Sequence, residues 1–229
     1  MIVWLCRLDV STYAARGRDV GPPRPACPHC GGPTGPWSGY LRHLRDAELH
    51  RIFVPRVRCR RCGRTAALLP WFATPYRWDT TDVIGRALEL AVAGVGVRRI
   101  AVALGRPETT VREWCRRFGR VATDLARVLL AAAVRAGWSG FDLPTAPGPR
   151  CLAAATALAS AWARRGGPVG VWRLAALVTG GAWLARNTTS PLAAGTVSPL
   201  MARTSRTTPP RGAPCHRIPP KPSPCGGTT

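Results

Sequence analysis

Four cysteines in two closely spaced pairs are the residues of this sequence best suited to chemistry. Cys27 and Cys30 stand in CPHCGG, and Cys59 and Cys62 stand in CRRCG, so each pair has CxxC spacing and is followed by glycine. Two residues between the sulfurs let both thiolates face one ion, and the glycine eases the tight turn. Because four sulfurs leave no open coordination position, the pattern predicts one structural zinc ion.

Other ligand sets remain open at this point. His29, His43 and His50 could replace a cysteine, and an iron–sulfur cluster is a further alternative. Arginines crowd the second cysteine pair, among them Arg58, Arg60 and Arg61. They could offset the negative charge of a zinc tetrathiolate, or they could contact phosphate.

The residues around the cysteines predict a zinc ribbon over 27–70. Residues 39–44 and 51–58 have the composition of two strands, and 46–50 can form the turn between them. Such a ribbon has little core, so metal binding should supply much of its folding free energy, on the order of 10 kcal/mol.

A helix-turn-helix is predicted over 80–121. Asp79 or Thr80 can cap a first helix, Gly94 and Gly96 end it, and Gly105 with a following proline gives a sharp connection between two later helices. Each helix has an apolar stripe at helical spacing, and the stripes consist of Ile84, Ala87, Leu88 and Ala91, then Val97, Ile100, Ala101 and Leu104, then Val111, Trp114, Cys115 and Phe118. Two short helices around a tight turn, preceded by a supporting helix, are typical of this motif.

The third helix is expected to enter the major groove of DNA, with its early positions at base edges and its later arginines at phosphates. The predicted DNA-contacting residues are Thr109, Thr110, Arg112, Glu113, Arg116, Arg117 and Arg120 on this helix, Arg98 and Arg99 on the helix before it, and Arg58, Arg60 and Arg61 in the ribbon. An ordinary three-helix bundle with a solvated basic face is the alternative interpretation of the same pattern.

The charge balance points to a polyanionic partner. The 229 residues carry 33 basic and 11 acidic side chains, for a formal net charge of +22, and all but one of the basic residues are arginines. This excess of arginine over lysine also fits coding bias in a GC-rich genome. No acid follows Asp142, so carboxylate chemistry is restricted to the front of the chain.

We expect a mainly α fold with a small β zinc ribbon. The predicted order is an N-terminal lead (1–26), the zinc ribbon (27–70), a linker (71–79), the helix-turn-helix (80–121), a helical region (122–185) and a disordered basic tail (186–229). Helices are expected at 122–137, 151–163 and within 168–185. They could form a homodimer face, but we expect them to pack within the chain.

The start of the chain has no features of a signal peptide, and charged residues interrupt its apolar stretches. We therefore expect a cytoplasmic protein with no membrane span. Reducing conditions there favour metal ligation or free thiols over disulfides.

Several segments resemble a known kind of protein. CPHCGG, WSGY, RVRCRRCG with TAALLP, and IAVALGRPETTVREWCRRF are similar to the zinc-ribbon and helix-turn-helix region of insertion-sequence transposases. The resemblance is closer to a bacterial family of uncharacterised proteins, found mostly in actinobacteria, over about residues 20–121. VWRLAALVTGG and LARNTTSP resemble its closing motif. The resemblance implies a metal-dependent DNA-binding front end that uses the four cysteines as ligands.

The chain departs from complete transposases of this kind, which use three spaced carboxylates on a ribonuclease H-like fold, because no acid follows Asp142. We therefore expect a zinc-dependent DNA-binding protein that is not an enzyme and has no small-molecule substrate. The alternatives are a degenerate transposase-derived protein that retains site recognition, and a zinc-ribbon module that docks on RNA or protein.

Overall fold

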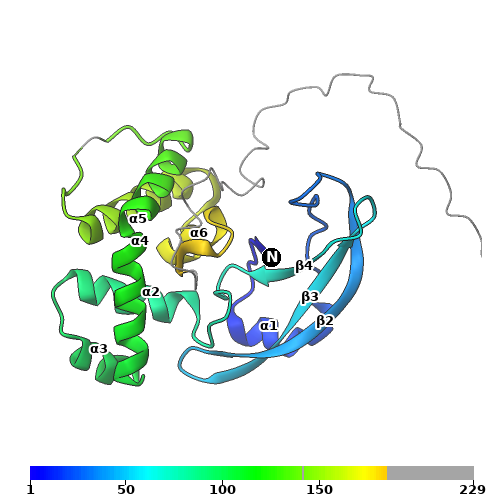
Figure 1. Cartoon of the computed structure of the whole chain (residues 1–229), viewed down its shortest axis with the longest axis horizontal. Helices are drawn as coiled ribbons and strands as arrows, with labels where there is room; N and C mark the ends of the chain where they lie inside the picture. Colours follow the sequence, from blue (N-terminus) through cyan, green and yellow to red (C-terminus); the bar gives the residue numbers. More distant parts are fainter. Residues whose placement is uncertain (141, 185–229) are drawn as a thin grey trace, which may run out of the picture.

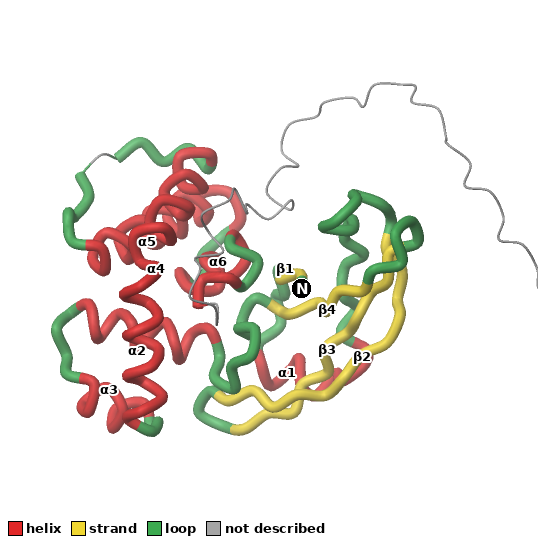
Figure 2. The backbone as a smooth tube through the Cα atoms, in the orientation of Figure 1, coloured by secondary structure: helices red, strands yellow, loops and turns green. Residues whose placement is uncertain are grey.

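The computed structural model describes residues 1–140 and 142–184, except for the side chain of residue 165. The strands of this part are β1 (Ile2–Trp4), β2 (Thr34–Arg45), β3 (Leu49–Cys59) and β4 (Thr65–Pro70). The helices are α1 (Val10–Arg16), α2 (Thr81–Val92), α3 (Val97–Leu104), α4 (Glu108–Arg135), α5 (Pro147–Gly166) and α6 (Val171–Val178), with short 3-10 turns η1 (Gly17–Asp19) and η2 (Ala182–Leu184). The sheet with α1 forms one half of the molecule, and α2–α6 form the other (Figures 1 and 2).

The sheet is larger than the predicted ribbon. β2 and β3 form the expected antiparallel hairpin, and β3 also pairs antiparallel with β4. β1 pairs parallel with β4, with Ile2 opposite Leu68, which completes the order β1-β4-β3-β2. The expected helices and small sheet are both present, but the class is mixed α/β and not mainly α. The fold is mixed α/β because the chain start and β4 widen the hairpin into a four-stranded sheet.

The hairpin contains a bulge and one obligatory glycine. The register shifts between Pro36 and Ser38, which leaves Trp37 as the extra residue of β2. Gly39 lies under the ring of Phe53, where an added Cβ would come within 2.1 Å of the ring carbon Cζ. A bulge bends a strand and re-aims a side chain, so this part of β2 presents Trp37 outward.

The predicted helix boundaries of the middle segment follow local signals. The side chain of Thr80 caps α2 by accepting a hydrogen bond from the Val83 N–H at 3.3 Å. Gly105 ends α3 in the left-handed conformation (φ 60°), and α4 starts directly after Pro107. α4 then continues for 28 residues, so the segment expected as a separate helix at 122–137 is the second half of α4.

An ion-pair cluster joins the hairpin to the turn between α3 and α4. The buried carboxylate of Asp79 accepts from Arg45 Nε at 3.0 Å and from Arg106 Nε at 2.5 Å. Arg106 also donates to the carbonyl of Asp46 at the hairpin tip. Because these partners come from three segments, the cluster fixes the start of α4 relative to the sheet.

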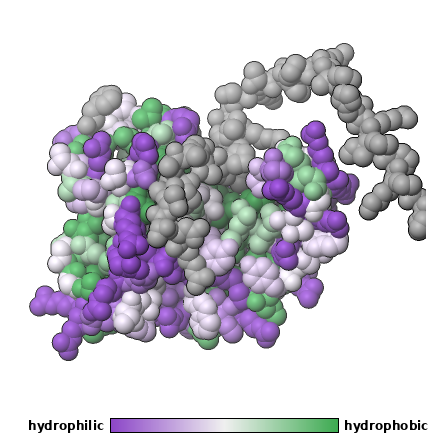
Figure 3. Space-filling model, in the orientation of Figure 1, coloured by the Kyte–Doolittle hydropathy of each residue, from purple (hydrophilic) through white to green (hydrophobic). Residues whose placement is uncertain are grey.

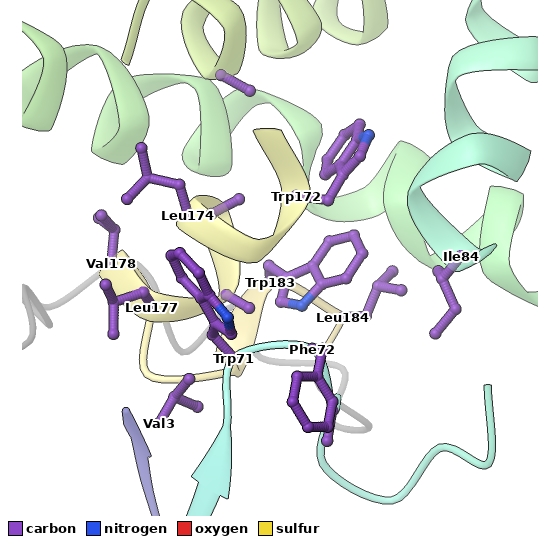
Figure 4. Close-up of a cluster of buried hydrophobic side chains, with 14 of the residues drawn as sticks. Val3, Trp71, Phe72, Ile84, Trp172, Leu174, Leu177, Val178, Trp183 and Leu184 are labelled. Carbon is purple, nitrogen blue, oxygen red and sulfur yellow. The ribbon is translucent and has the colours of Figure 1, made fainter. Parts of the chain in front are cut away.

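A buried aromatic cluster packs the sheet against the helices (Figure 4). Trp71 and Phe72 follow β4 and lie against α6 and η2, where Trp172 and Trp183 stack with ring centroids 5.2 Å apart. Gly85 of α2 lets α6 approach closely, since an added Cβ would lie 2.0 Å from Cδ1 of Trp172. The two halves therefore share one core.

The structure bears differently on the expected tail and on the expected absence of a membrane span. The predicted disordered basic tail lies outside the described residues, as do Cys215 and Cys225. Among the helices that are described, none combines the length and apolarity required to cross a bilayer.

Candidate metal centre

The two cysteine pairs meet in space at the end of the hairpin. The Sγ atoms of Cys27, Cys30, Cys59 and Cys62 all lie within 4.8 Å of one another. Two of the separations are 3.7 Å, between Cys27 and Cys62, and 3.5 Å, between Cys30 and Cys59. Sulfurs bound tetrahedrally to zinc at about 2.3 Å are about 3.8 Å apart. The four thiols could therefore bind one metal ion, and a structural zinc fits both their geometry and their chemistry.

Both pairs use the same backbone turn. The carbonyl of Cys27 accepts from the N–H of Gly31 at 2.9 Å, and the carbonyl of Cys59 accepts from the N–H of Gly63 at 3.1 Å. These glycines have φ values of 69° and 71°, which side-chain-bearing residues rarely adopt. The Arg60 N–H, which donates to the Pro33 carbonyl at 2.9 Å, holds the two turns together.

Local hydrogen bonds prepare one thiolate and disfavour another in the metal-free protein. The backbone N–H of Cys62, with help from that of Arg61, lowers the pKa of the Cys59 thiol to about 6. The backbone N–H of His29 lowers the pKa of Cys27. The Gly32 N–H favours the Cys30 thiolate, but desolvation and the neighbouring thiols outweigh it and raise the pKa of Cys30 to about 11.

Metal affinity is expected to fall as the pH falls. At neutral pH, Cys59 is already a thiolate, whereas the pKa of about 11 keeps Cys30 protonated, so binding a metal must release at least one proton. One released proton makes the affinity change about tenfold per pH unit. Competition with a chromophoric chelator at pH 6.5 and 7.5 measures this slope. A pH-independent affinity would contradict binding through all four thiolates.

The histidines considered as alternative ligands contact other groups. Nδ1 of His29 lies 3.3 Å from a guanidinium nitrogen of Arg64, and the ring of His43 lies 5.5 Å from that of Trp78. Nε2 of His50 lies 2.9 Å from a carboxylate oxygen of Asp46. In the described residues, the metal-ligating side chains grouped at this end of the sheet are the four cysteines.

All three ribbon arginines predicted to contact DNA, Arg58, Arg60 and Arg61, are exposed beside the cysteines. Arg58 also has fixed contacts: its Nε donates to the Gly63 carbonyl at 3.3 Å, and its guanidinium lies 4.5 Å from the ring centroid of Trp37. The cysteine turn thus positions Arg58, a contact that the sequence pattern did not reveal.

The other predicted contacts lie on α3 and the first part of α4. Arg98, Arg99, Thr109, Arg112, Arg116 and Arg120 are exposed, whereas Thr110, Glu113 and Arg117 are partly buried. The acidic residues in the first part of α4 form ion pairs with its arginines: Glu108 pairs with Arg112, and Glu113 pairs with both Arg116 and Arg117. Hydrogen bonding from Arg116, with Arg117, lowers the pKa of Glu113.

The structure therefore divides the predicted contacts between two places. The ribbon arginines lie at the cysteine end of the hairpin, and the helical ones lie beyond its tip (Figure 1). Ten residue steps along β3, from Leu49 to Cys59, span about 34 Å at about 3.4 Å per residue. The two groups do not form one continuous patch.

One comparison with known proteins gives a match. Residues 27–114 match a family model described as a domain of unknown function (DUF6431). The matched segment starts at the first clustered cysteine and ends inside α4, so it contains the candidate metal centre, the hairpin, α2 and α3. No curated protein and no solved structure is significantly similar to the chain.

Proposed function

We propose that this chain is a zinc-dependent DNA-binding protein without catalytic activity, organised like the front end of an insertion-sequence transposase. The observation that carries the proposal is the exposed basic surface of α3 and the first part of α4, which a tight glycine turn presents. Figure 3 shows hydrophilic side chains gathered over α3 and the adjoining part of α4. We place the protein in the cytoplasm, where reducing conditions keep cysteines available to metal.

In this proposal, α3 and α4 form a helix-turn-helix, and the start of α4 is the recognition element. Thr109 and Arg112 stand in its first turns, as expected of residues that reach base edges. The ion pair between Arg112 and Glu108 is exposed, with 61% and 42% of the side chains accessible. Exposed pairs contribute at most about 1 kcal/mol, so these arginines can leave their partners for DNA at little cost.

The metal has a structural role in this proposal. Zinc would be held by the four cysteines and would supply rigidity to the end of the hairpin. Arg60 and Arg61 would then contact phosphates as a separate group from the helical arginines. Contacts of this kind make affinity depend on salt and add little sequence preference.

Replacing the arginines at the start of α4 tests the proposal. The variants Arg112→Ala and Arg116→Ala are compared by selection from a randomised duplex pool and by binding at two salt concentrations. We expect Arg112→Ala to relax preference at one base position, a loss of about 1–3 kcal/mol. Arg116→Ala should weaken binding to all duplexes and reduce the salt slope by about 1.

Arg127→Ala is the matched control, because Arg127 lies further along the same helix and is also exposed, with 67% of its side chain accessible. It should bind like the unchanged protein. A chain that enriches no sequence, or an Arg112→Ala variant that enriches the same sequence as its parent, would contradict recognition through α4.

A further inference from the structure

A second surface collects the exposed aromatic side chains of the molecule. In the described part of the chain these are Trp37, Tyr40, Tyr76 and Trp78, with 55%, 42%, 67% and 62% of their surface accessible. Trp37 and Tyr40 belong to β2, the edge strand, and the other two belong to the segment between β4 and α2. Grouped exposed aromatics mark interaction sites more often than single ones do.

The strand register places aromatic and basic side chains on one face of the hairpin. Tyr40 is opposite Val54, Ser38 is opposite Arg56, and Gly35 is opposite Arg58. Because alternate residues of a strand share a face, Tyr40, Arg56 and Arg58 lie on the same side. Trp37, the bulge residue, joins them, since the Arg58 guanidinium lies 4.5 Å from its ring centroid.

The segment between β4 and α2 extends this row along the strand edge. Arg42 donates to the carbonyls of Thr74, at 3.3 Å, and Arg77, and the Arg45 N–H donates to the Trp78 carbonyl at 2.6 Å. These bonds hold the segment beside β2 and set the Trp78 ring 5.5 Å from that of His43, which lies on the opposite face of β2 from Tyr40. The aromatic rings therefore follow the edge of the sheet and do not share one face.

Tyr76 has a φ of 59°, an unusual conformation for a bulky residue. Non-glycine residues held in this region cost on the order of 1–3 kcal/mol and cluster at functional sites. Here the conformation accompanies a tyrosine ring that is two-thirds exposed beside the strand edge.

The charge along this row is mainly positive, and its acidic neighbours, Asp46, Glu48 and Asp79, stand at the hairpin tip. Residues 20–45 and 49–78 contain ten arginines and no acidic residue. Arg56 and Arg58 lie on the same face of the hairpin as Tyr40, and the Arg58 guanidinium lies against the Trp37 ring. A surface of stacked rings between cations complements a polyanion that carries exposed bases, which is the chemistry of a single-stranded nucleic acid.

We propose that this aromatic edge binds single-stranded nucleic acid. Bases stack on Trp37, Tyr40 and Trp78, while the neighbouring arginines contact phosphates. Six residue steps from Trp37 to His43, at about 3.4 Å each, give a row of about 20 Å, which suits the lower end of the roughly 4–16 nucleotides that single-strand grooves hold. This binding does not depend on duplex recognition by α4.

Fluorescence anisotropy of labelled oligonucleotides on the zinc-loaded full chain tests the proposal. The probes are a 15-nucleotide oligo(dT), an oligo(rU) of equal length, and a mixed-sequence duplex. We expect both single strands to bind, and their ratio shows whether DNA or RNA is preferred. A Trp37→Ala/Tyr40→Ala variant should bind single strands at least about tenfold more weakly, since each stacked base contributes about 1–3 kcal/mol.

Leu41→Ala is the matched control, because Leu41 is similarly exposed (50%) on the same strand but has no aromatic ring on which a base could stack. It should leave single-strand binding unchanged. Trp37→Phe should retain most of the affinity because it keeps an aromatic face. Trp78→Ala should also weaken single-strand binding. Because Trp78 lies outside β2, this variant tests the proposal even if the double substitution in β2 disturbs the hairpin.

Three results would overturn the proposal. One is single-strand affinity that the aromatic variants do not change, and another is an equal loss for single strands and duplex, which would indicate charge alone. The third is a dimer, seen by sedimentation, that dissociates in the double variant without any single-strand binding, because the edge would then be a subunit interface. Failure of duplex recognition would appear separately, in Arg112→Ala and Arg116→Ala.

Discussion

Removing the metal is expected to unfold the cysteine end of the hairpin while α2–α6 stay folded. That end depends on the two cysteine turns, whose backbone hydrogen bonds are short-range and whose four sulfurs lie together with little covering core. Structural zinc supplies on the order of 10 kcal/mol to such a site. The opposite end of the hairpin has its own support from Asp79 and from buried residues such as Ile52 and Val54.

Hydrogen exchange measured by mass spectrometry, with and without chelator, can show which end of the hairpin unfolds when the metal is removed. We expect a loss of protection in residues 27–34 and 57–65 and unchanged protection in α2 and α4. Native mass spectrometry should give one zinc per chain, and Cys59→Ser should reproduce the effect of the chelator. Cys151→Ser is the control, because this cysteine is buried in α5, away from the cluster. Uniform unfolding, or no change on chelation, would each contradict the prediction.

Replacing Asp79 with alanine is expected to destabilise the protein by about 3–5 kcal/mol, the cost of breaking a buried ion pair by removing one partner. Only 6% of the Asp79 side chain and 7% of the Arg106 side chain are accessible, so Arg106 would keep its charge in a buried place without a carboxylate. Arg45 is 33% accessible and can turn to water, so most of the effect should come through Arg106.

Urea denaturation of the zinc-loaded protein measures this loss. Asp124→Ala is the control, since its partner Arg127 is 67% accessible, and exposed pairs contribute at most about 1 kcal/mol. A double-mutant cycle with Arg106→Met isolates the pair: the double variant should be more stable than Asp79→Ala alone, because the buried charge is gone. Equal effects of Asp79→Ala and Asp124→Ala would show that the cluster does not hold the two halves together.

Local signals predicted the parts of the fold that depend on neighbouring residues. The CxxC pairs with their glycines gave the clustered cysteines, and the composition of 39–44 and 51–58 gave the hairpin. Thr80 and Gly105 marked helix ends because a cap and a left-handed residue act within one turn. The predicted end of the third helix was wrong, since no proline interrupts α4 and Gly119 lies within it.

Contacts between distant residues were beyond the sequence pattern. The parallel pairing of β1 with β4 joins residues 66 positions apart, as Ile2 with Leu68, and neither three-residue β1 nor its partner carries a signal for the other. Arg106 looked like an ordinary turn residue, yet it reaches Asp79 and the hairpin tip. The exposure of Trp37 and Tyr40 depends on which face of β2 the rest of the chain leaves uncovered.

The pairing of β1 with β4 also determines how the protein can be shortened. A fragment that begins at Cys27 would keep every clustered thiol, but β4 would lose its neighbour along Leu68, Leu69 and Pro70. Apolar strand edges without a neighbour promote aggregation. Poor solubility of such a fragment would then reflect the missing first strand and would give no information about the metal. Truncations for biophysical work should therefore retain the chain from its first residues.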